Sequence, residues 1–321
     1  MTPMRKKSSG KKDRKKWGKK RKKKRDWKAY HEKLVRRGEL LIPSDKAEEW
    51  RRELAAMNEG KEGAAYLYPD QLIECLSLMK CTLKLPYRAA TGFGSKLLRL
   101  GGIVAKPDPS TLCRRLRKLG KKYYSGRKKV KDDEPLYVVF DGTGLKVCNR
   151  GEWMHYKHKG KRKGFVRVCF MFSTKDGELL DFSATTEKVG EQDKIRPMIK
   201  RTARNREIGK LAVDGAGDDA RNFELLKALK IKPAIKIRKN ADPNPADKRG
   251  KKQRLKEVRK YKKWGYQGWV KRRRYGQRWQ GETGISCFKG YFGEYVFSKG
   301  MSNIKAEVGL KAHFYNLLRL G

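Results

Sequence analysis

The sequence of 321 residues has few acidic residues and no long hydrophobic run. Asp and Glu number 35 against 83 Lys and Arg, which gives a formal net charge of +48. Self-repulsion of this size is relieved best by a polyanion, so the composition favours a nucleic-acid partner over a merely soluble basic surface. Without a run of about 18 apolar residues we expect no membrane-spanning helix. The basic N-terminus also lacks the apolar segment of a secretory signal.

Cysteine pairs are missing as well. The six cysteines are scattered, and none belongs to a Cys-x-x-Cys pair (Cys75, Cys81, Cys113, Cys148, Cys169 and Cys287). Most stand among apolar neighbours, as buried thiols usually do. This usage argues against a disulfide framework or a zinc ribbon and fits a reducing interior.

The first half of the chain divides into a basic arm and a helical region. Residues 1–28 are low-complexity Lys/Arg, which cannot bury enough surface to fold alone. We predict that this arm is disordered without DNA and contacts phosphates non-specifically; in a eukaryote it could also be a nuclear-import signal. Residues 29–130 have helical periodicity and are predicted to form a helix-turn-helix-like DNA-binding domain.

One helix in this region has the features of a DNA-recognition helix. Pro107-Asp108-Pro109-Ser110 announces it, with Ser110 as the natural N-cap, and leucines at positions 112, 116 and 119 form an apolar stripe. The other face carries four cations (Arg114, Arg115, Arg117 and Lys118). A short capped helix with a basic outer face is typical of DNA recognition. An ordinary solvated amphipathic helix explains the pattern equally well.

Residues 131–321 follow a different pattern, in which β-strands alternate with helices. Leu136–Phe140 predicts a buried strand that ends at Asp141-Gly142, and strands at 165–173 and 179–185 form a hairpin. A helix at 191–205, a strand at 209–213, a helix at 222–229 and a strand at 232–239 follow. This order predicts an α/β ribonuclease-H-like core, a mixed sheet flanked by helices. Residues 240–270 are interpreted as a basic insertion, and 271–297 and 303–320 as helices.

Two aspartates follow predicted core strands. Asp141 and Asp214 each stand at the carboxyl end of a strand, and each is followed by Gly. Ligands bind at this edge of open α/β sheets, and a carboxylate there is costly unless it is solvated, paired or bound to metal. One such Asp would be an ordinary turn former. Two of them indicate a site.

A polar stripe follows near the C-terminus. Tyr275, Arg278, Glu282 and Lys289 are offset by three, four and seven residues. At about 100° per residue, these offsets place all four side chains within roughly 60° on one helix face. A structural helix would make that stripe apolar, so this one should face a cavity or a ligand. The acid can hold a metal, and the cations can hold phosphate.

The stripe resembles a known signature. Tyr-x2-Arg-x3-Glu-x6-Lys is similar to the sequence around the third carboxylate in DDE transposases of the insertion-sequence-4 and insertion-sequence-5 groups, and all four positions match. Looser likenesses to the insertion-sequence-5 group extend over the chain (residues 36–39, 68–70, 85–88, 107–111 and 313–316). One departure is Gly217, where the family usually has an aromatic residue.

The resemblance implies a mechanism and a set of roles. Asp141, Asp214 and Glu282 would be a triad that holds two Mg²⁺ ions, which Mn²⁺ can replace. Water would cut at the end of the element, and the 3′-OH released would then attack target DNA. Arg278 and Lys289 would contact phosphates near the scissile bond. The partners would be the terminal inverted repeats and the target DNA.

The roles of the two aromatic residues and the assembly are further expectations. Tyr275 would position DNA or stack on it. Trp279 could receive an unstacked base, although a packed Trp is the more common role. A homodimer that pairs two element ends is expected by analogy. The resemblance also implies a prokaryotic cytoplasm, where the protein would associate with the nucleoid.

Two other functions and several other roles for single residues also fit the sequence. A nuclease of the same fold could cut without joining, and a basic nucleic-acid-binding protein could lack catalysis. His155 and His158 form only a weak zinc pattern, and a basic loop over DNA suits them better. Asp218 and Asp219 are expected to cap a helix or lie in its first turn. Two further acids, Glu187 and Glu191, are alternates for a carboxylate ligand, although they match no motif.

Overall fold

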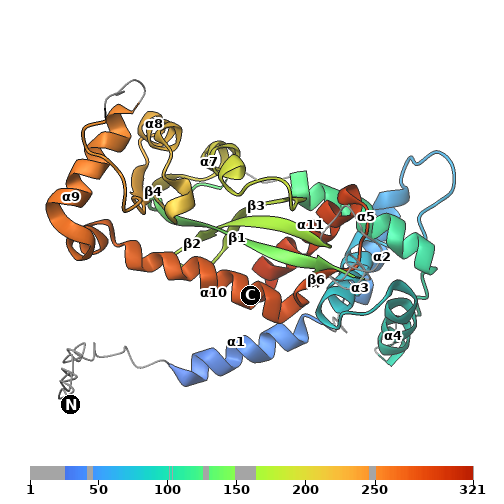
Figure 1. Cartoon of the computed structure of the whole chain (residues 1–321). Helices are drawn as coiled ribbons and strands as arrows, with labels where there is room; N and C mark the ends of the chain where they lie inside the picture. Colours follow the sequence, from blue (N-terminus) through green and yellow to red (C-terminus); the bar gives the residue numbers. More distant parts are fainter. Residues whose placement is uncertain are drawn as a thin grey trace, which may run out of the picture.

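The computed structural model describes residues 26–41, 46–100, 102, 104–125, 130–148, 164–245 and 251–320. Several predictions lie outside these residues: most of the basic arm, His155 and His158, and part of the basic insertion. Figure 1 shows a sheet with helices on both sides and a group of helices at one end. None of the described helices is long and apolar enough to cross a membrane.

The N-terminal region is helical, as the sequence predicts. It contains α1 (Trp27–Glu39), α2 (Ala47–Asn58), α3 (Asp70–Thr82), α4 (Tyr87–Leu100) and α5 (Pro109–Ser125). The predicted leucine stripe of α5 is buried. The predicted cap is wrong by two positions, because α5 begins at Pro109 and the carboxylate of Asp108 accepts a 2.8 Å hydrogen bond from the amide of Ser110. An aspartate before proline can cap the first turn, since Pro109 has no amide hydrogen of its own.

The sheet has the predicted strands in a mixed arrangement. They are β1 (Leu136–Val147), β2 (Phe165–Ser173), β3 (Leu179–Thr186), β4 (Ile208–Val213), β5 (Lys232–Ile235) and β6 (Tyr295–Val296). The order is β3-β2-β1-β4-β5, and β6 pairs with the far end of β1. The first three strands pair antiparallel, and β4 and β5 run parallel to β1. This is the ribonuclease-H-like arrangement that the element order predicts.

The prediction that the first strand ends at Asp141 is wrong. β1 runs six residues further, to Val147. Its parallel pairing with β4 ends at Val139, but its antiparallel pairing with β2 continues through Asp141, opposite Phe170. Asp141 therefore lies inside a strand, just beyond the point where β4 leaves it. One side of β1 is open there, which gives the carboxylate access to ligands.

Helices cover both faces of the sheet (Figure 1). On one face α7 (Gln192–Asn205) and α8 (Ala220–Ala228) bury apolar residues of β1, β2 and β4. On the other lie α10 (Trp279–Phe292) and α11 (Met301–Leu320). The core on this second face also contains side chains of α3, α4 and α5, so apolar packing is continuous across the predicted boundary at residue 130.

Two expectations for the C-terminal part are wrong. Much of the predicted insertion is a 22-residue helix, α9 (Lys252–Arg273), which is kinked at Gly265 with φ of 63°. The predicted helix over 271–297 is divided into the 3-10 turn η2 (Tyr275–Arg278), α10 and β6. The helical periodicity of α9 is weak in the sequence, because long lysine and arginine side chains occupy positions where a helix usually has apolar residues.

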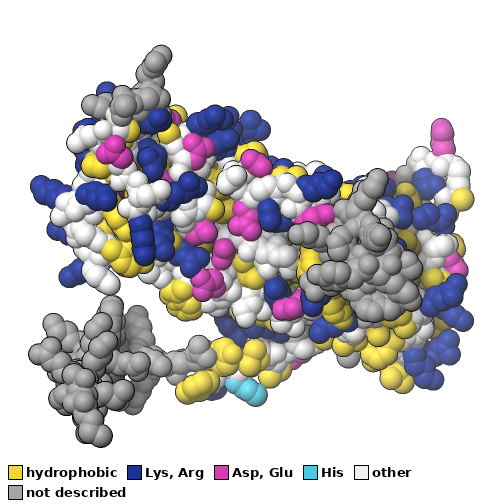
Figure 2. Space-filling model, in the orientation of Figure 1, with side chains coloured by type: hydrophobic (Ala, Val, Ile, Leu, Met, Phe, Trp, Pro, Cys, Tyr) yellow, Lys and Arg dark blue, Asp and Glu magenta, His cyan; other side chains and the backbone are white. Residues whose placement is uncertain are grey.

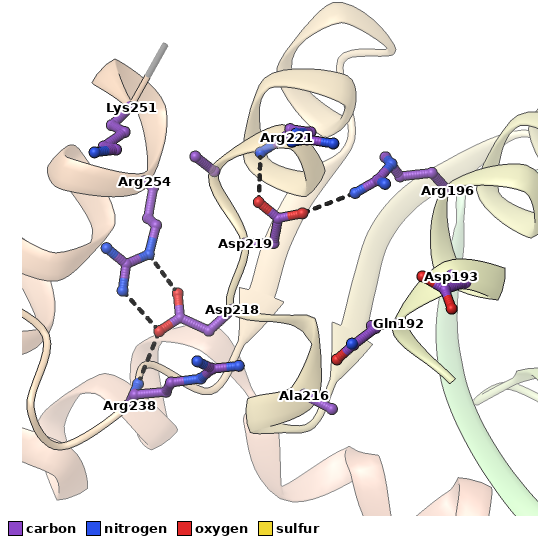
Figure 3. A pocket seen from close by; sticks show the side chains of 11 residues that line it. Gln192, Asp193, Arg196, Ala216, Asp218, Asp219, Arg221, Arg238, Lys251 and Arg254 are labelled. Atoms are coloured by element: carbon purple, nitrogen blue, oxygen red, sulfur yellow. Dashed lines mark hydrogen bonds and ion pairs between the residues drawn. The ribbon is translucent and has the colours of Figure 1, made fainter. Parts of the chain in front are cut away.

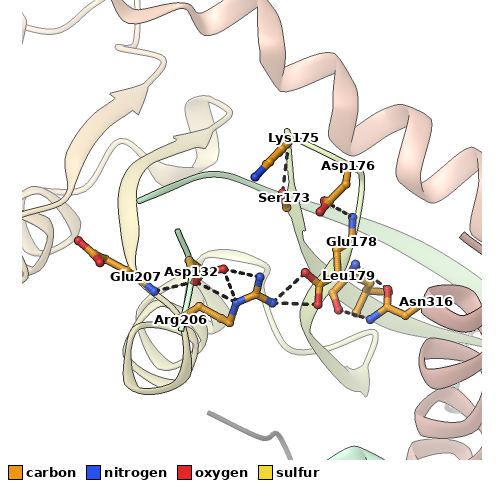
Figure 4. Close-up of polar contacts among 9 residues, drawn as sticks. All are labelled: Asp132, Ser173, Lys175, Asp176, Glu178, Leu179, Arg206, Glu207 and Asn316. Carbon is orange, nitrogen blue, oxygen red and sulfur yellow. Dashed lines mark hydrogen bonds and ion pairs between the residues drawn. The ribbon is translucent and has the colours of Figure 1, made fainter. Parts of the chain in front are cut away.

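A buried ion network ties the hairpin to the start of the sheet (Figure 4). Arg206, which follows α7, donates to Asp132 before β1 and to Glu178 in the β2–β3 turn, at 2.7 and 2.8 Å. These hydrogen bonds hold the pKa of the Asp132 carboxyl below its usual value. Next to it, the Asn316 side chain of α11 makes both backbone hydrogen bonds of Leu179. The network fixes the hairpin relative to α7 and α11.

Candidate active site

Two of the predicted carboxylates, Asp141 and Glu282, lie at the open side of β1. Asp141 shares the α10 face of β1 with Val139, and Gly281 of α10 packs against both: a Cβ atom on Gly281 would lie 3.1 Å from the Asp141 Cβ. The next residue of α10 is Glu282. A depression of about 570 Å³ opens here, and its lining includes Asp141, Glu282 and Lys289.

The three acids influence one another electrostatically. Burial raises the pKa of Asp141, and the carboxylates of Asp214 and Glu282 raise it further. The Gly142 amide, 3.0 Å from the Asp141 carboxylate, and the Arg278 guanidinium act in the opposite direction. Asp214 caps η1 (Gly215–Gly217) by accepting a hydrogen bond from the Ala216 amide at 3.0 Å. Asp141 and Glu282 therefore line one depression, and Asp214 follows β4, the strand next to β1.

Arg278 pairs with two of these acids. Its guanidinium contacts Glu282 four residues later and lies 3.9 Å from the Asp141 carboxylate. The side chain is three-quarters buried, so the attraction is screened less than at an open surface. The arrangement lowers the cost of holding two negative groups close together.

A fourth carboxylate lies near Asp141. Glu191, the residue before α7, sits so close to Gly142 that a Cβ there would be 2.7 Å from the Glu191 Cδ. Burial raises the pKa of Glu191, and Asp214 and Asp141 raise it further, while Arg167 at 3.7 Å opposes this. The other alternate, Glu187, makes no side-chain hydrogen bond or ion pair with the described residues. Gly142, which follows Asp141, was the signal in the sequence that another residue, here Glu191, packs closely against this strand.

The donor set suits a hard divalent cation. Carboxylate oxygens are the ligands that Mg²⁺ and Mn²⁺ prefer. Burial and the charges of Asp214 and Glu282 raise the pKa of Asp141, and a bound cation would favour its ionised form. Within the described ranges, no three His, Cys, Asp or Glu side chains are close enough to hold one ion. Arg278 supplies the positive charge between Asp141 and Glu282 in this arrangement.

The two aromatic residues of the signature differ from expectation. Tyr275 is only 7% exposed, in a cluster with Val139 and with Trp269, whose ring centroid is 5.1 Å away. Burial raises the pKa of its phenol. Tyr275 therefore packs under the site and does not present its ring to DNA. Trp279 is 55% exposed, so the expectation of a packed Trp is wrong and a ring free to stack is present.

The basic residues of α5 do not form one face. Arg115 points inward: its side chain is 13% exposed, pairs with Asp70 at 2.5 Å and donates to the Tyr68 carbonyl. The prediction that it contacts DNA is therefore contradicted by its burial. Arg114, Arg117 and Lys118 are exposed, as expected of residues that could reach a phosphate backbone.

Of the two acids expected to cap a helix or lie in its first turn, Asp219 does so and Asp218 does not. Asp219 caps α8 by accepting from the Arg221 amide at 3.2 Å. Asp218 is buried and pairs with Arg254 at 2.7 Å. Neither stands with the triad. The six cysteines are free thiols.

The fold and its acidic edge define a class, the ribonuclease-H-like phosphoryl-transfer proteins, and the comparisons define the family. Residues 133–317 match the family model described as a transposase DDE domain, and residues 35–150 match a second model of the same description. The first match covers more than half of the chain, so the chain belongs to the DDE transposase family. It is a transposase, an enzyme that cuts DNA and transfers strands.

Two solved structures show a distant likeness. One is a piggyBac transposase synaptic complex with hairpin DNA, with 8% identity, a TM-score of 0.35 and coverage of 88% of this chain and 73% of that chain. The other is the Drosophila P element transposase strand transfer complex, with 11% identity, a TM-score of 0.29 and coverage of 59% and 42%. The assignment depends on the family match alone.

Proposed function

We propose that the protein is the transposase of an insertion sequence and that Asp141, Asp214 and Glu282 are its catalytic carboxylates. The observation that carries this proposal is the position of Asp141 and Glu282 in one depression at the open side of β1, beside the strand that Asp214 follows. The charges of Asp214 and Glu282 also raise the pKa of Asp141, after the larger effect of burial. Grouped carboxylates with perturbed pKa values are characteristic of phosphoryl-transfer sites. The terminal inverted repeats of the element and the target DNA are the proposed substrates.

The proposed reaction has two steps at one site. In the first, water attacks a phosphodiester at the end of the element; a P–O bond forms, the bond to the 3′ oxygen breaks, and a free 3′-OH remains. In the second, that hydroxyl attacks a target phosphodiester, so that one P–O bond again replaces another. The protein forms no covalent intermediate, and its carboxylates orient the reacting groups.

Mg²⁺ is the proposed cofactor, held by Asp141, Asp214 and Glu282, and Mn²⁺ can replace it. When bound, two such ions supply activation of the attacking oxygen and stabilisation of the leaving oxygen. Arg278 and Lys289 are proposed to contact phosphates beside the scissile bond, since both lie at the acidic depression or pair with its acids. Trp279 is proposed to stack on an unpaired base next to them.

The remaining proposals concern the helical region and the assembly. Arg114, Arg117 and Lys118 are exposed on α5 and are proposed to follow a DNA backbone. A homodimer would pair the two ends of the element. We also propose that the protein acts at the nucleoid in a prokaryotic cytoplasm, where its insertion sequence would reside.

The first test is Mg²⁺-dependent cleavage and strand transfer on labelled DNA that carries the ends of the element. Wild type should nick at the ends and join them to target, whereas Glu282→Gln should bind the same DNA and do neither. Glu187→Gln is the matched control, because Glu187 makes no polar contact with the described residues, and it should retain activity. Cutting without joining would favour a nuclease. Binding without cutting, with Mn²⁺ also tried, would favour a non-catalytic binding protein.

A further inference from the structure

A second cavity shares no lining residue with the acidic depression. It has a volume of about 560 Å³ and lies between the beginnings of α7, α8 and α9 (Figure 3). Five cationic side chains line it (Arg196, Arg221, Arg238, Lys251 and Arg254). Figure 2 shows that Lys and Arg are also frequent on the surface over these helices.

Two of the three acids in the lining, Asp218 and Asp219, hold the walls of the cavity together. The Asp218 side chain is fully buried; it pairs with Arg254 at 2.7 Å and accepts from the Arg238 amide at 3.0 Å. Asp219 pairs with Arg196 at 2.8 Å while it caps α8. These contacts join α7, α8, α9 and the segment after β5 around the cavity (Figure 3). Arg196 and Arg254 are therefore held in place before any ligand binds.

Two guanidinium groups at the cavity have no acidic partner among the described residues. The Arg221 side chain makes no hydrogen bond or ion pair with any of them. Arg238 has only a long contact, 3.4 Å, with the Gly215 carbonyl. Both side chains are exposed, so their planar forks can each take two oxygens of one phosphate.

The position of the cavity connects it with catalysis. Ala216, two residues after Asp214, belongs to its lining, as does Gln192, which directly follows Glu191. Lys289 lies in the other depression, on the α10 side of the acids. The lining therefore begins within two residues of Asp214 and one residue of Glu191, so a DNA strand bound at the acidic edge passes close to the cavity.

We propose that this cavity binds backbone phosphates of the DNA strand that passes over the catalytic carboxylates, with Arg221 and Arg238 as its direct contacts. The inference rests on the proposed function, because it assigns a second anchor to the same DNA. None of the described lining residues is aromatic, so the cavity offers no surface on which a base could stack. Its contacts are therefore with phosphate and do not depend on sequence.

The test is the salt dependence of DNA binding by Arg221→Gln/Arg238→Gln. These substitutions remove two charges and leave the ion pairs of Asp218 and Asp219 intact. The matched control is Lys200→Gln/Arg204→Gln, which removes two exposed charges from α7 outside the cavity. Binding to the element end and to an unrelated duplex is measured over a range of salt concentrations.

The slope of log K against log salt should fall by about 1 for each phosphate that the protein no longer neutralises, so by about 2 in the cavity variant and not in the control. The weakening should be equal for both duplexes. A cavity variant with the wild-type slope, an equal weakening in the control, or a weakening confined to one sequence would each overturn the inference. DNA cleavage by the wild-type protein is measured in parallel. Absence of cleavage would count against the proposed function, whereas an unchanged salt slope in the cavity variant would count against phosphate binding in the cavity.

Discussion

Gly281 of α10 lies directly against Asp141 of β1. A Cβ atom on Gly281 would be 3.1 Å from the Asp141 Cβ and 2.8 Å from Cγ1 of Val139. The glycine weakens the prediction of a helix here, since glycine costs about 1 kcal/mol relative to alanine inside a helix. Its presence is explained by packing, because only a residue without a side chain lets α10 bring Glu282 this close to the strand.

We therefore expect Gly281→Ala to move α10 away from β1. Overpacking of this kind costs about 1–3 kcal/mol, and Glu282 would shift with the helix. If Glu282 is catalytic as proposed, cleavage should fall at least about tenfold, because a small displacement of a reacting group slows the reaction strongly. The measurements are thermal unfolding and end cleavage.

Gly290→Ala is the control for stability. Nothing lies within 4 Å of a Cβ built on Gly290 of the same helix. This substitution should raise the melting temperature slightly through helix propensity. Equal melting temperatures for the two variants would contradict the packing argument.

The ion pairs of Arg278 lead to a prediction about the binding of divalent ions. Its guanidinium pairs with Asp141 and Glu282, two of the groups proposed to hold metal, so it competes with a bound cation. In Arg278→Gln the rise in melting temperature on adding Mg²⁺ should be larger than in wild type, because a ligand stabilises a protein according to its affinity for the native state. Arg274→Gln, an exposed neighbour, should respond like wild type. Identical increments in all three proteins would exclude this competition.

Trp279 allows binding and stability to be separated. Since its side chain is 55% exposed, Trp279→Ala should leave the melting temperature almost unchanged. Loss of a base–aromatic stack costs about 1–3 kcal/mol, so strand transfer should weaken roughly five- to hundredfold. Trp279→Phe should retain most activity. The measurements are unfolding and transfer assays on one substrate, and full activity of Trp279→Ala would argue against stacking.

The cations of α5 should divide into two groups. Arg115→Gln leaves Asp70 and the Tyr68 carbonyl without their partner and should destabilise the protein by about 1–3 kcal/mol. Arg117→Gln/Lys118→Gln should instead preserve stability and weaken DNA binding, with a smaller salt slope. Thermal unfolding and DNA titrations distinguish the two. The reverse pattern would show that Arg115 faces DNA after all.

The sequence predicts the elements of this fold well, because apolar periodicity and turn residues are local properties. The strands β2 and β3 and the glycine turn between them begin and end within a residue of expectation. The pattern could not show how far each strand stays paired with its neighbouring strands. β1 extends past Asp141 because β2 still pairs with it, and nothing in residues 136–147 announces that partner.

The residues of the candidate site were predictable where their spacing along the sequence matches a known signature or the end of a strand. Asp141 and Glu282 line one depression, and Asp214 follows the neighbouring strand β4; the catalytic roles of the three acids stay a prediction. Side-chain direction was not predictable. Arg115 points inward because it pairs with Asp70, and Tyr275 does so because it packs against Trp269. Helical spacing does not reveal partners that are distant in the sequence.

Acid should remove the contribution of the Arg206 network to stability. The pKa of Asp132 is lowered in the folded protein, so the ionised form stabilises the fold above the usual carboxyl pKa of about 3.9, and that contribution is lost as pH falls through the lower, folded value. Asp132→Asn should cost about 1–3 kcal/mol at neutral pH, since its side chain is only 7% exposed. Near pH 3 (roughly) the difference from wild type should shrink.

Asp133→Asn provides the comparison, because Asp133 is exposed and makes no side-chain hydrogen bond or ion pair with the described residues. It should unfold like wild type at every pH. Urea unfolding of the three proteins across the acid range measures both effects. If the Asp132→Asn deficit were the same in acid as at neutral pH, the carboxylate charge would not be what Arg206 recognises, and the network would act through packing alone.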